Sequence, residues 1–121
     1  MKKILVIDDE APVRKMLNAL LTSNGYDVIE AENGKKGLAL FDEHSPDLLI
    51  TDIVMPESDG LEIITTLKRN KSDMAIIAIS SGGKMANTKM YLTLASKLGV
   101  DKIFEKPVDN ELLISAIKSL I

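Results

Sequence analysis

Acidic, hydroxyl and amine side chains follow several short apolar runs in the sequence. Asp8 and Asp9 come directly after the first run, Asp52 follows a later one, and Ser80 and Lys106 follow two more. A carboxylate can attack phosphorus to form an aspartyl phosphate, while an amine and a hydroxyl bind the oxygens of the transferring group. These residue types indicate phosphoryl chemistry at Asp52. Taken singly, each residue has an ordinary explanation as a helix cap, a strand end or a surface lysine.

The carboxylates also indicate a divalent cation. If the runs before Asp8 and Asp52 form neighbouring strands, the carboxylates of Asp8, Asp9 and Asp52 share one cleft and repel each other unless a cation neutralises them. Mg²⁺ fits, because it takes oxygen ligands from one or two carboxylates and completes its shell with water and phosphate. Calcium would need more ligands, and a chain with one histidine and no cysteine is a poor candidate for zinc.

Five short runs rich in aliphatic residues predict β-strands, and the segments between them have the 3.6-residue period of amphipathic helices. This βα alternation, repeated five times, predicts an α/β fold with a parallel sheet and helices on both faces. Ligands bind such sheets at the carboxyl ends of the strands, so the polar residues are expected to meet at one edge. The predicted strands are Ile4–Ile7, Tyr26–Ala31, Leu48–Ile50, Ala75–Ile79 and Lys102–Phe104.

Particular residue types predict where several helices begin and end. Pro12 suits the first turn of a helix, and Gly25 suits the position just past its end. Asp59 and Asp109 are expected to cap the helices that follow them. Gly99 is expected to close another helix.

The bulk composition narrows the class of protein. The chain has 121 residues, 45% of them hydrophobic, which predicts a single domain over residues 1–121 with an aliphatic core. A net charge of −3 argues against nucleic acid as a partner, because phosphate backbones select basic surfaces. The first apolar run is too short for a signal peptide or a transmembrane span. The prediction is therefore a cytoplasmic protein without a membrane partner.

Taken together, these segments resemble the receiver domain of two-component response regulators, and in particular the chemotaxis response regulator. The resemblance covers essentially the whole chain, and four matching segments occur in the expected order. It implies a flavodoxin-like, doubly wound (βα)5 sandwich whose five parallel strands have the order 2-1-3-4-5. The matching segments are Ile4–Glu10, Asp52–Gly60, Ile79–Ser81 and Lys106–Pro107.

The resemblance also implies a role for each candidate residue at the metal site. Asp9 is expected to bind Mg²⁺ directly, and Asp8 to act mostly through water. Asp52 and the backbone carbonyl of Val54 complete the implied ligand set.

A second group of roles concerns the phosphoryl group. The resemblance implies that Asp52 is the phosphoacceptor, that Ser80 is the switch hydroxyl and that Lys106 pairs with the phosphate. It further implies a cis peptide bond before Pro107.

The implied function is a switch rather than an enzyme, since the chain would catalyse only its own phosphorylation and dephosphorylation. The donor is expected to be a phosphohistidine on a sensor histidine kinase or a histidine phosphotransfer protein, or a small acyl phosphate. Phosphorylation would change the face formed by the fourth helix, fifth strand and fifth helix, which binds a separate target protein. We expect a stand-alone monomer or weak dimer.

The sequence departs from the family pattern in two places. Ile103 occupies the position, three residues before Lys106, where family members often carry an aromatic residue, while Phe104 falls on the core-facing register. Isoleucine cannot rotate inward as an aromatic switch residue does. The stretch between Ser80 and Gly99 is also longer than usual by about one helical turn, with the surplus in Ser81–Thr88. Coupling to the partner face is therefore expected to be weaker or differently routed.

Two other functions compete with the switch. An Mg²⁺-dependent phosphatase or phosphotransferase would also use an aspartyl intermediate, but such enzymes need a cap to enclose the substrate, and a chain of this length has no room for one. A phosphorylation-independent binding module would tolerate loss of the acidic and lysine positions, yet all of these are present.

Overall fold

The computed structural model describes residues 1–53, 60–70, 74–80, 93 and 97–121. Its five strands form one parallel sheet with the order β2-β1-β3-β4-β5, which confirms the prediction. The strands are β1 (Lys3–Ile7), β2 (Asp27–Ala31), β3 (Leu48–Asp52), β4 (Ala75–Ser80) and β5 (Lys102–Glu105). The helices are α1 (Ala11–Ser23), α2 (Gly34–His44), α3 (Gly60–Asn70) and α5 (Asn110–Leu120).

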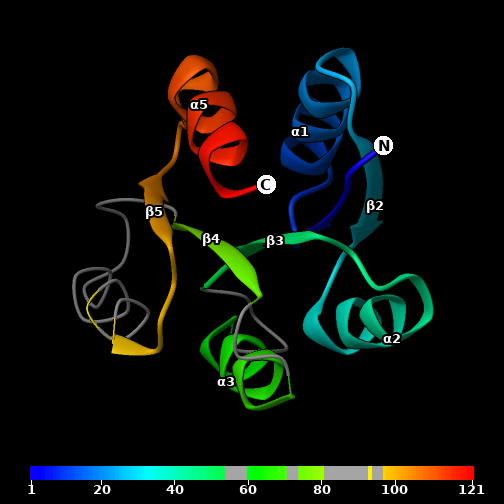
Figure 1. The fold of residues 1–121 in the computed structure, drawn as a ribbon, viewed down its shortest axis with the longest axis vertical. Helices are drawn as coiled ribbons and strands as arrows, with labels where there is room; N and C mark the ends of the chain where they lie inside the picture. The colour runs from blue at the N-terminus through cyan, green and yellow to red at the C-terminus, as the bar shows by residue number, and fades with distance from the viewer. Residues whose placement is uncertain (54–59, 71–73, 81–92, 94–96) are drawn as a thin grey trace.

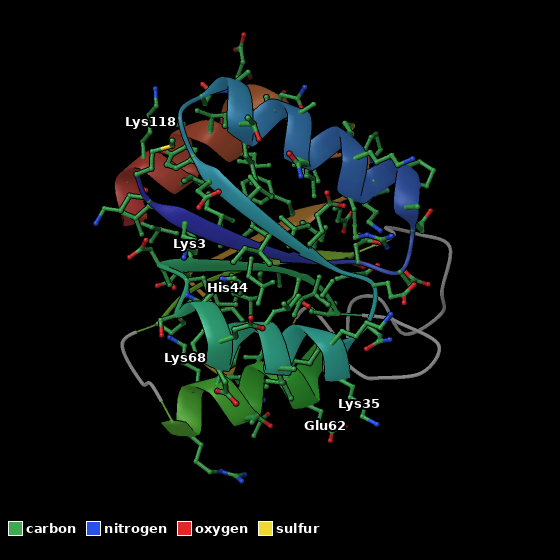
Figure 2. All side chains as sticks on the ribbon, turned by 90° about the vertical axis from the view of Figure 1, so that its right-hand side faces the viewer. Lys3, Lys35, His44, Glu62, Lys68 and Lys118 are labelled. Atoms are coloured by element: carbon green, nitrogen blue, oxygen red, sulfur yellow. The ribbon has the colours of Figure 1, made fainter. Side chains whose placement is uncertain are left out.

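Helices cover both faces of the sheet. Helices α1 and α5 lie on one face and α2 and α3 on the other (Figure 1). Figure 2 shows α2 and α3 running in the same direction, with Lys35 and Glu62 near their first turns and His44 and Lys68 near their ends. Among the helices that the structure describes, none combines the length and apolarity that crossing a membrane requires.

The sheet separates two aliphatic cores. Successive side chains of a strand point to opposite faces, so alternate residues of β1 pack in different cores. Leu5 and Ile7 pack with α2 and α3, whereas Ile4 and Val6 pack with α1 and α5. Strands β1, β3 and β4 are buried on both faces, which explains why their sequences are almost continuously apolar.

The helix boundaries follow local capping chemistry. Pro12 lies in the first turn of α1, and Gly25 after its end has a positive φ of 89°. The Asp109 side chain accepts a hydrogen bond from the Leu112 N–H and caps α5 as predicted. Asn33 caps α2 in the same way, a role not predicted from the sequence. The predicted cap Asp59 and the surplus segment Ser81–Thr88 lie outside the described residues.

Gly37 allows α2 to approach β1 closely. A Cβ atom at this position would lie 2.8 Å from Ile7 Cγ1 and closer still to Ile7 Cδ1. Ile7 is fully buried, so it has little room to move away. An alanine at position 37 would therefore displace the Ile7 side chain, and glycine avoids this crowding although it lowers helix propensity.

We predict that Gly37→Ala lowers the free energy of unfolding by about 1–2 kcal/mol, because overpacking outweighs the better helix propensity of alanine. Urea unfolding measures the change. The control is the double variant with Ile7→Val, which removes Cδ1 and should lose less stability than the sum of the two single losses. An alanine variant as stable as the wild type would contradict the proposed crowding.

Candidate functional site

Strand register brings the predicted site residues to the carboxyl edge of the sheet. Ile7 of β1 pairs with Thr51 of β3, so Asp8 and Asp52 follow side by side. Asp52 pairs with Ile79 of β4, which places Ser80 one residue further along the neighbouring strand. The sheet therefore sets the relative positions of these three side chains.

Four carboxylates gather at this edge. One oxygen each of Asp8, Asp9, Glu10 and Asp52 lies within 4.8 Å of the others. Asp8 and Asp52 are buried, with 0% and 1% of their surface exposed, whereas Asp9 and Glu10 are exposed. The cluster thus has a buried acidic floor, Asp8 and Asp52, and an exposed acidic rim, Asp9 and Glu10.

The amine of Lys106 contacts three of these four carboxylates. Its Nζ atom donates hydrogen bonds to Glu10 Oε1 at 2.9 Å and Asp52 Oδ2 at 3.0 Å, and forms an ion pair with Asp8 Oδ2 at 2.8 Å. Its backbone N–H donates to the Ser80 carbonyl at 2.7 Å, which connects the loop after β5 to the end of β4. The lysine therefore contacts residues at the carboxyl ends of three different strands.

These contacts shift two pKa values. Burial raises the pKa of the Asp8 carboxyl above its usual range, and the nearby Asp52 carboxylate adds to the rise, while Lys106 and the Glu10 N–H oppose it. Burial alone would lower the pKa of Lys106, but its interactions with Asp8, Glu10 and Asp52 outweigh burial and raise its pKa above the usual range. Lys106 therefore stays charged at neutral pH.

Asp8 is held in place by its backbone as well as its side chain. Its N–H donates to the Ala31 carbonyl at 3.1 Å, and its carbonyl accepts from Arg14 Nη1 at 2.6 Å. Its Oδ1 atom accepts from the Glu10 N–H at 2.8 Å. Arg14 also forms an ion pair with Glu30 of β2, in which Nε lies 3.5 Å from Oε1. Neither Arg14 nor the Glu10 carboxylate was predicted to take part, and the only signal in the sequence was their closeness to Asp8.

The donor set suits a small, hard cation. All four side chains offer carboxylate oxygens, which are the ligands that Mg²⁺ prefers. Asp8 Oδ2 is buried and forms an ion pair with Lys106, and as a carboxylate oxygen it retains capacity for a further ligand. These residues therefore fit Mg²⁺. Val54, the fourth predicted ligand, lies outside the described residues.

The structure also describes the two β5 residues at which the sequence departs from the family pattern, and the peptide bond before Pro107. Ile103 is half-buried against the core beneath α2 and α3, and Phe104 is half-buried against the core beneath α1 and α5. The Lys106–Pro107 peptide bond is cis, as the resemblance implied.

A profile of the response regulator receiver domain family matches residues 4–118. The chain belongs to this family. Receiver domains are signalling modules of two-component systems that bind Mg²⁺ at an acidic pocket and are phosphorylated by histidine kinases. The acidic cluster described above is the corresponding feature of this receiver domain.

Individual relatives agree with this assignment. The probable transcriptional regulator ycf27 of Porphyra purpurea is 36% identical over 120 residues, which cover 99% of this chain and 47% of that protein. The chain thus spans about half the length of this curated relative. A receiver domain protein from Clostridium thermocellum has a TM-score of 0.88 and 35% identity, and the match covers 100% of this chain and 94% of that one. Response regulator TrrA from Thermotoga maritima, solved in complex with Mg²⁺–BeF, has a TM-score of 0.86 and 33% identity over the full length of both chains.

We predict that Asp8→Asn stabilises the metal-free protein at pH 7 by on the order of 1 kcal/mol, because it removes a buried charge. Since the folded pKa of Asp8 is raised, the folded state holds more protons than the unfolded state above pH ~4, and its stability falls as pH rises through that raised pKa. The gain should therefore shrink toward pH 4. Urea unfolding in a chelator across this pH range measures it.

The control is Asp42→Asn, which removes the same charge from an exposed position on α2. It should change stability little and without this pH dependence. A gain from Asp8→Asn that is constant between pH 4 and 7 would contradict the assignment of the raised pKa to Asp8.

Proposed function

We propose that this receiver domain is a phosphorylation-activated switch that accepts a phosphoryl group on Asp52. The observation that supports this most directly is the Lys106 amine, 3.0 Å from Asp52 Oδ2 and within a cluster of four carboxylates. The amine is already beside the carboxylate that would carry the phosphoryl group. Neutralising the charge of the transferring group is most of what such a reaction requires.

The proposed reaction exchanges one phosphorus bond for another. An Asp52 carboxylate oxygen forms a bond to phosphorus while the bond from phosphorus to the donor's imidazole nitrogen breaks, and that nitrogen keeps the electron pair. Lys106 pairs with a phosphoryl oxygen, and the Ser80 hydroxyl donates a hydrogen bond to another. Bound Mg²⁺, held by Asp8, Asp9 and Asp52 together with the Val54 carbonyl, would supply further positive charge at the same oxygens.

The proposed partners lie on either side of this reaction. The donor is a phosphohistidine on a sensor kinase or phosphotransfer protein, and the complex of the relative TrrA with Mg²⁺–BeF supports the same chemistry here. Phosphorylation adds charge and acceptor oxygens, which would draw in Ser80 and Lys106. The signal would leave through the face that carries β5 and α5, toward a target protein.

We predict that wild type gains one phosphoryl group after incubation with acetyl phosphate and Mg²⁺, while Asp52→Asn gains none. The amide nitrogen is a poor nucleophile, and the variant keeps the size of the side chain. Intact mass measures the product, and Asp42→Asn, on the exposed face of α2, serves as the control that should react normally. Equal phosphorylation of Asp52→Asn would reject the proposed acceptor, and sustained turnover of a phosphoester would favour an enzyme instead.

A further inference from the structure

We propose that Glu10 is a positioning residue that keeps the Lys106 amine over Asp52 while the two buried carboxylates change partners. This inference rests on the proposed function, because it concerns the amine that would pair with the phosphoryl group. The supporting observation is the hydrogen bond from Lys106 Nζ to Glu10 Oε1 at 2.9 Å, between residues 96 positions apart. This hydrogen bond holds the Lys106 amine through a residue that is neither the proposed phosphoacceptor nor a proposed metal ligand.

Glu10 lies at the start of α1, where a side chain can cap the helix by accepting a hydrogen bond. It is the N-cap residue of α1, a position whose side chain commonly accepts a hydrogen bond from the first turn. Glu10 makes no such bond. The Val13 and Arg14 N–H groups donate instead to its backbone carbonyl, each at 3.1 Å. The Glu10 carboxylate therefore makes no capping bond to its own helix, and it bonds Lys106 instead.

The three carboxylate partners of Lys106 differ in burial and in their proposed roles in the reaction. An ammonium group carries three N–H donors, and the Lys106 nitrogen lies within 3.0 Å of three carboxylates. Asp8 and Asp52 are buried and belong to the proposed metal and phosphoryl sites. Glu10 is at the rim, with 54% of its side chain exposed. When the inner carboxylates change partners, the contact with Glu10 can persist.

This contact restricts a flexible side chain. Lysine carries its charge on a four-carbon stem, so its nitrogen can occupy many positions unless neighbours hold it. The Lys106 side chain is only 13% exposed, and Glu10 is fixed through its backbone to the start of α1. With Glu10 removed, the amine would spend less time beside Asp52, and phosphorylation would slow.

A different role for Glu10 would give different results. If it only added negative charge to the rim, it would repel an anionic phosphodonor, and its removal would speed the reaction. If it acted directly on bound Mg²⁺, its removal would slow the reaction whether or not Lys106 were present. Comparison of single and double variants separates these roles from positioning through Lys106.

The test measures the rate of phosphorylation by acetyl phosphate at saturating Mg²⁺. We expect Glu10→Ala to slow the reaction about two- to fivefold, which corresponds to the upper part of the range for a partly exposed ion pair. Glu10→Gln should fall between alanine and wild type, because its side-chain oxygen still accepts a hydrogen bond. In a Lys106→Met background, Glu10→Ala should have no further effect. A rate for Glu10→Ala equal to or above wild type, or an equal loss in both backgrounds, would overturn the inference.

Glu32→Ala is the matched control. Glu32 is an exposed carboxylate just after β2 that pairs with Lys36, so its removal takes one negative charge from the same edge of the sheet without removing a partner of Lys106. Its phosphorylation rate should match wild type. Thermal unfolding of every variant shows whether the comparison is between folded proteins.

A second readout needs no metal. In metal-free protein we expect the Lys106 ammonium to give a ¹⁵N signal with slow hydrogen exchange, which Glu10→Ala makes faster and Glu32→Ala leaves unchanged. Unchanged exchange in Glu10→Ala would reject the contact itself. If wild type is not phosphorylated on Asp52, the proposed function fails, and this measurement still decides whether Glu10 holds the amine.

Discussion

The burial of two carboxylates beside one lysine amine is the constraint on which this site depends. Asp8 and Asp52 are almost fully buried at the ends of neighbouring strands, and like charges in such a place repel strongly. Lys106 supplies the compensating charge from a loop that is distant in sequence. Burial of the Lys106 amine is tolerated for the same reason, because Asp8, Glu10 and Asp52 together surround it with opposite charge.

The apolar sheet makes that arrangement possible. Three central strands are buried on both faces, so a slip in register would expose a whole set of aliphatic side chains. Register in turn fixes Asp8 beside Asp52, and Ser80 one residue beyond the partner of Asp52. The precision of the site is thus a consequence of core packing, and the polar residues need only extend from the ends of rigid strands.

The same contacts connect the site to the rest of the molecule. The Lys106 N–H bonds the Ser80 carbonyl, so the residues proposed to bind the phosphoryl group are joined through their backbones. Three residues earlier, Ile103 packs against the core beneath α2 and α3. The branched side chain of Ile103 is stiff and cannot rotate between an outward and an inward position as an aromatic switch residue does. We therefore expect this receiver domain to transmit a signal along β5 more weakly or by another route.

The residue pattern alone was enough for the parallel sheet and for the edge at which the site lies, whereas the strand order came from the resemblance to the receiver domain family. Aliphatic runs and helical periods identify the elements, and the rule that parallel strands place ligands at their carboxyl ends gathers Asp8, Asp52 and Lys106. Strand limits were less accurate: β3 and β4 continue through Asp52 and Ser80, because the ladder extends to the polar residues themselves.

Only the tertiary structure decided which partners those residues take. The Glu10 carboxylate bonds Lys106 rather than its own helix, and Arg14 bonds the Asp8 carbonyl rather than solvent alone. Such contacts depend on side-chain rotamers and on distances between segments far apart in the chain. The spacing of residues in the sequence gives neither the rotamers nor these distances, so the contacts could not be predicted from the sequence.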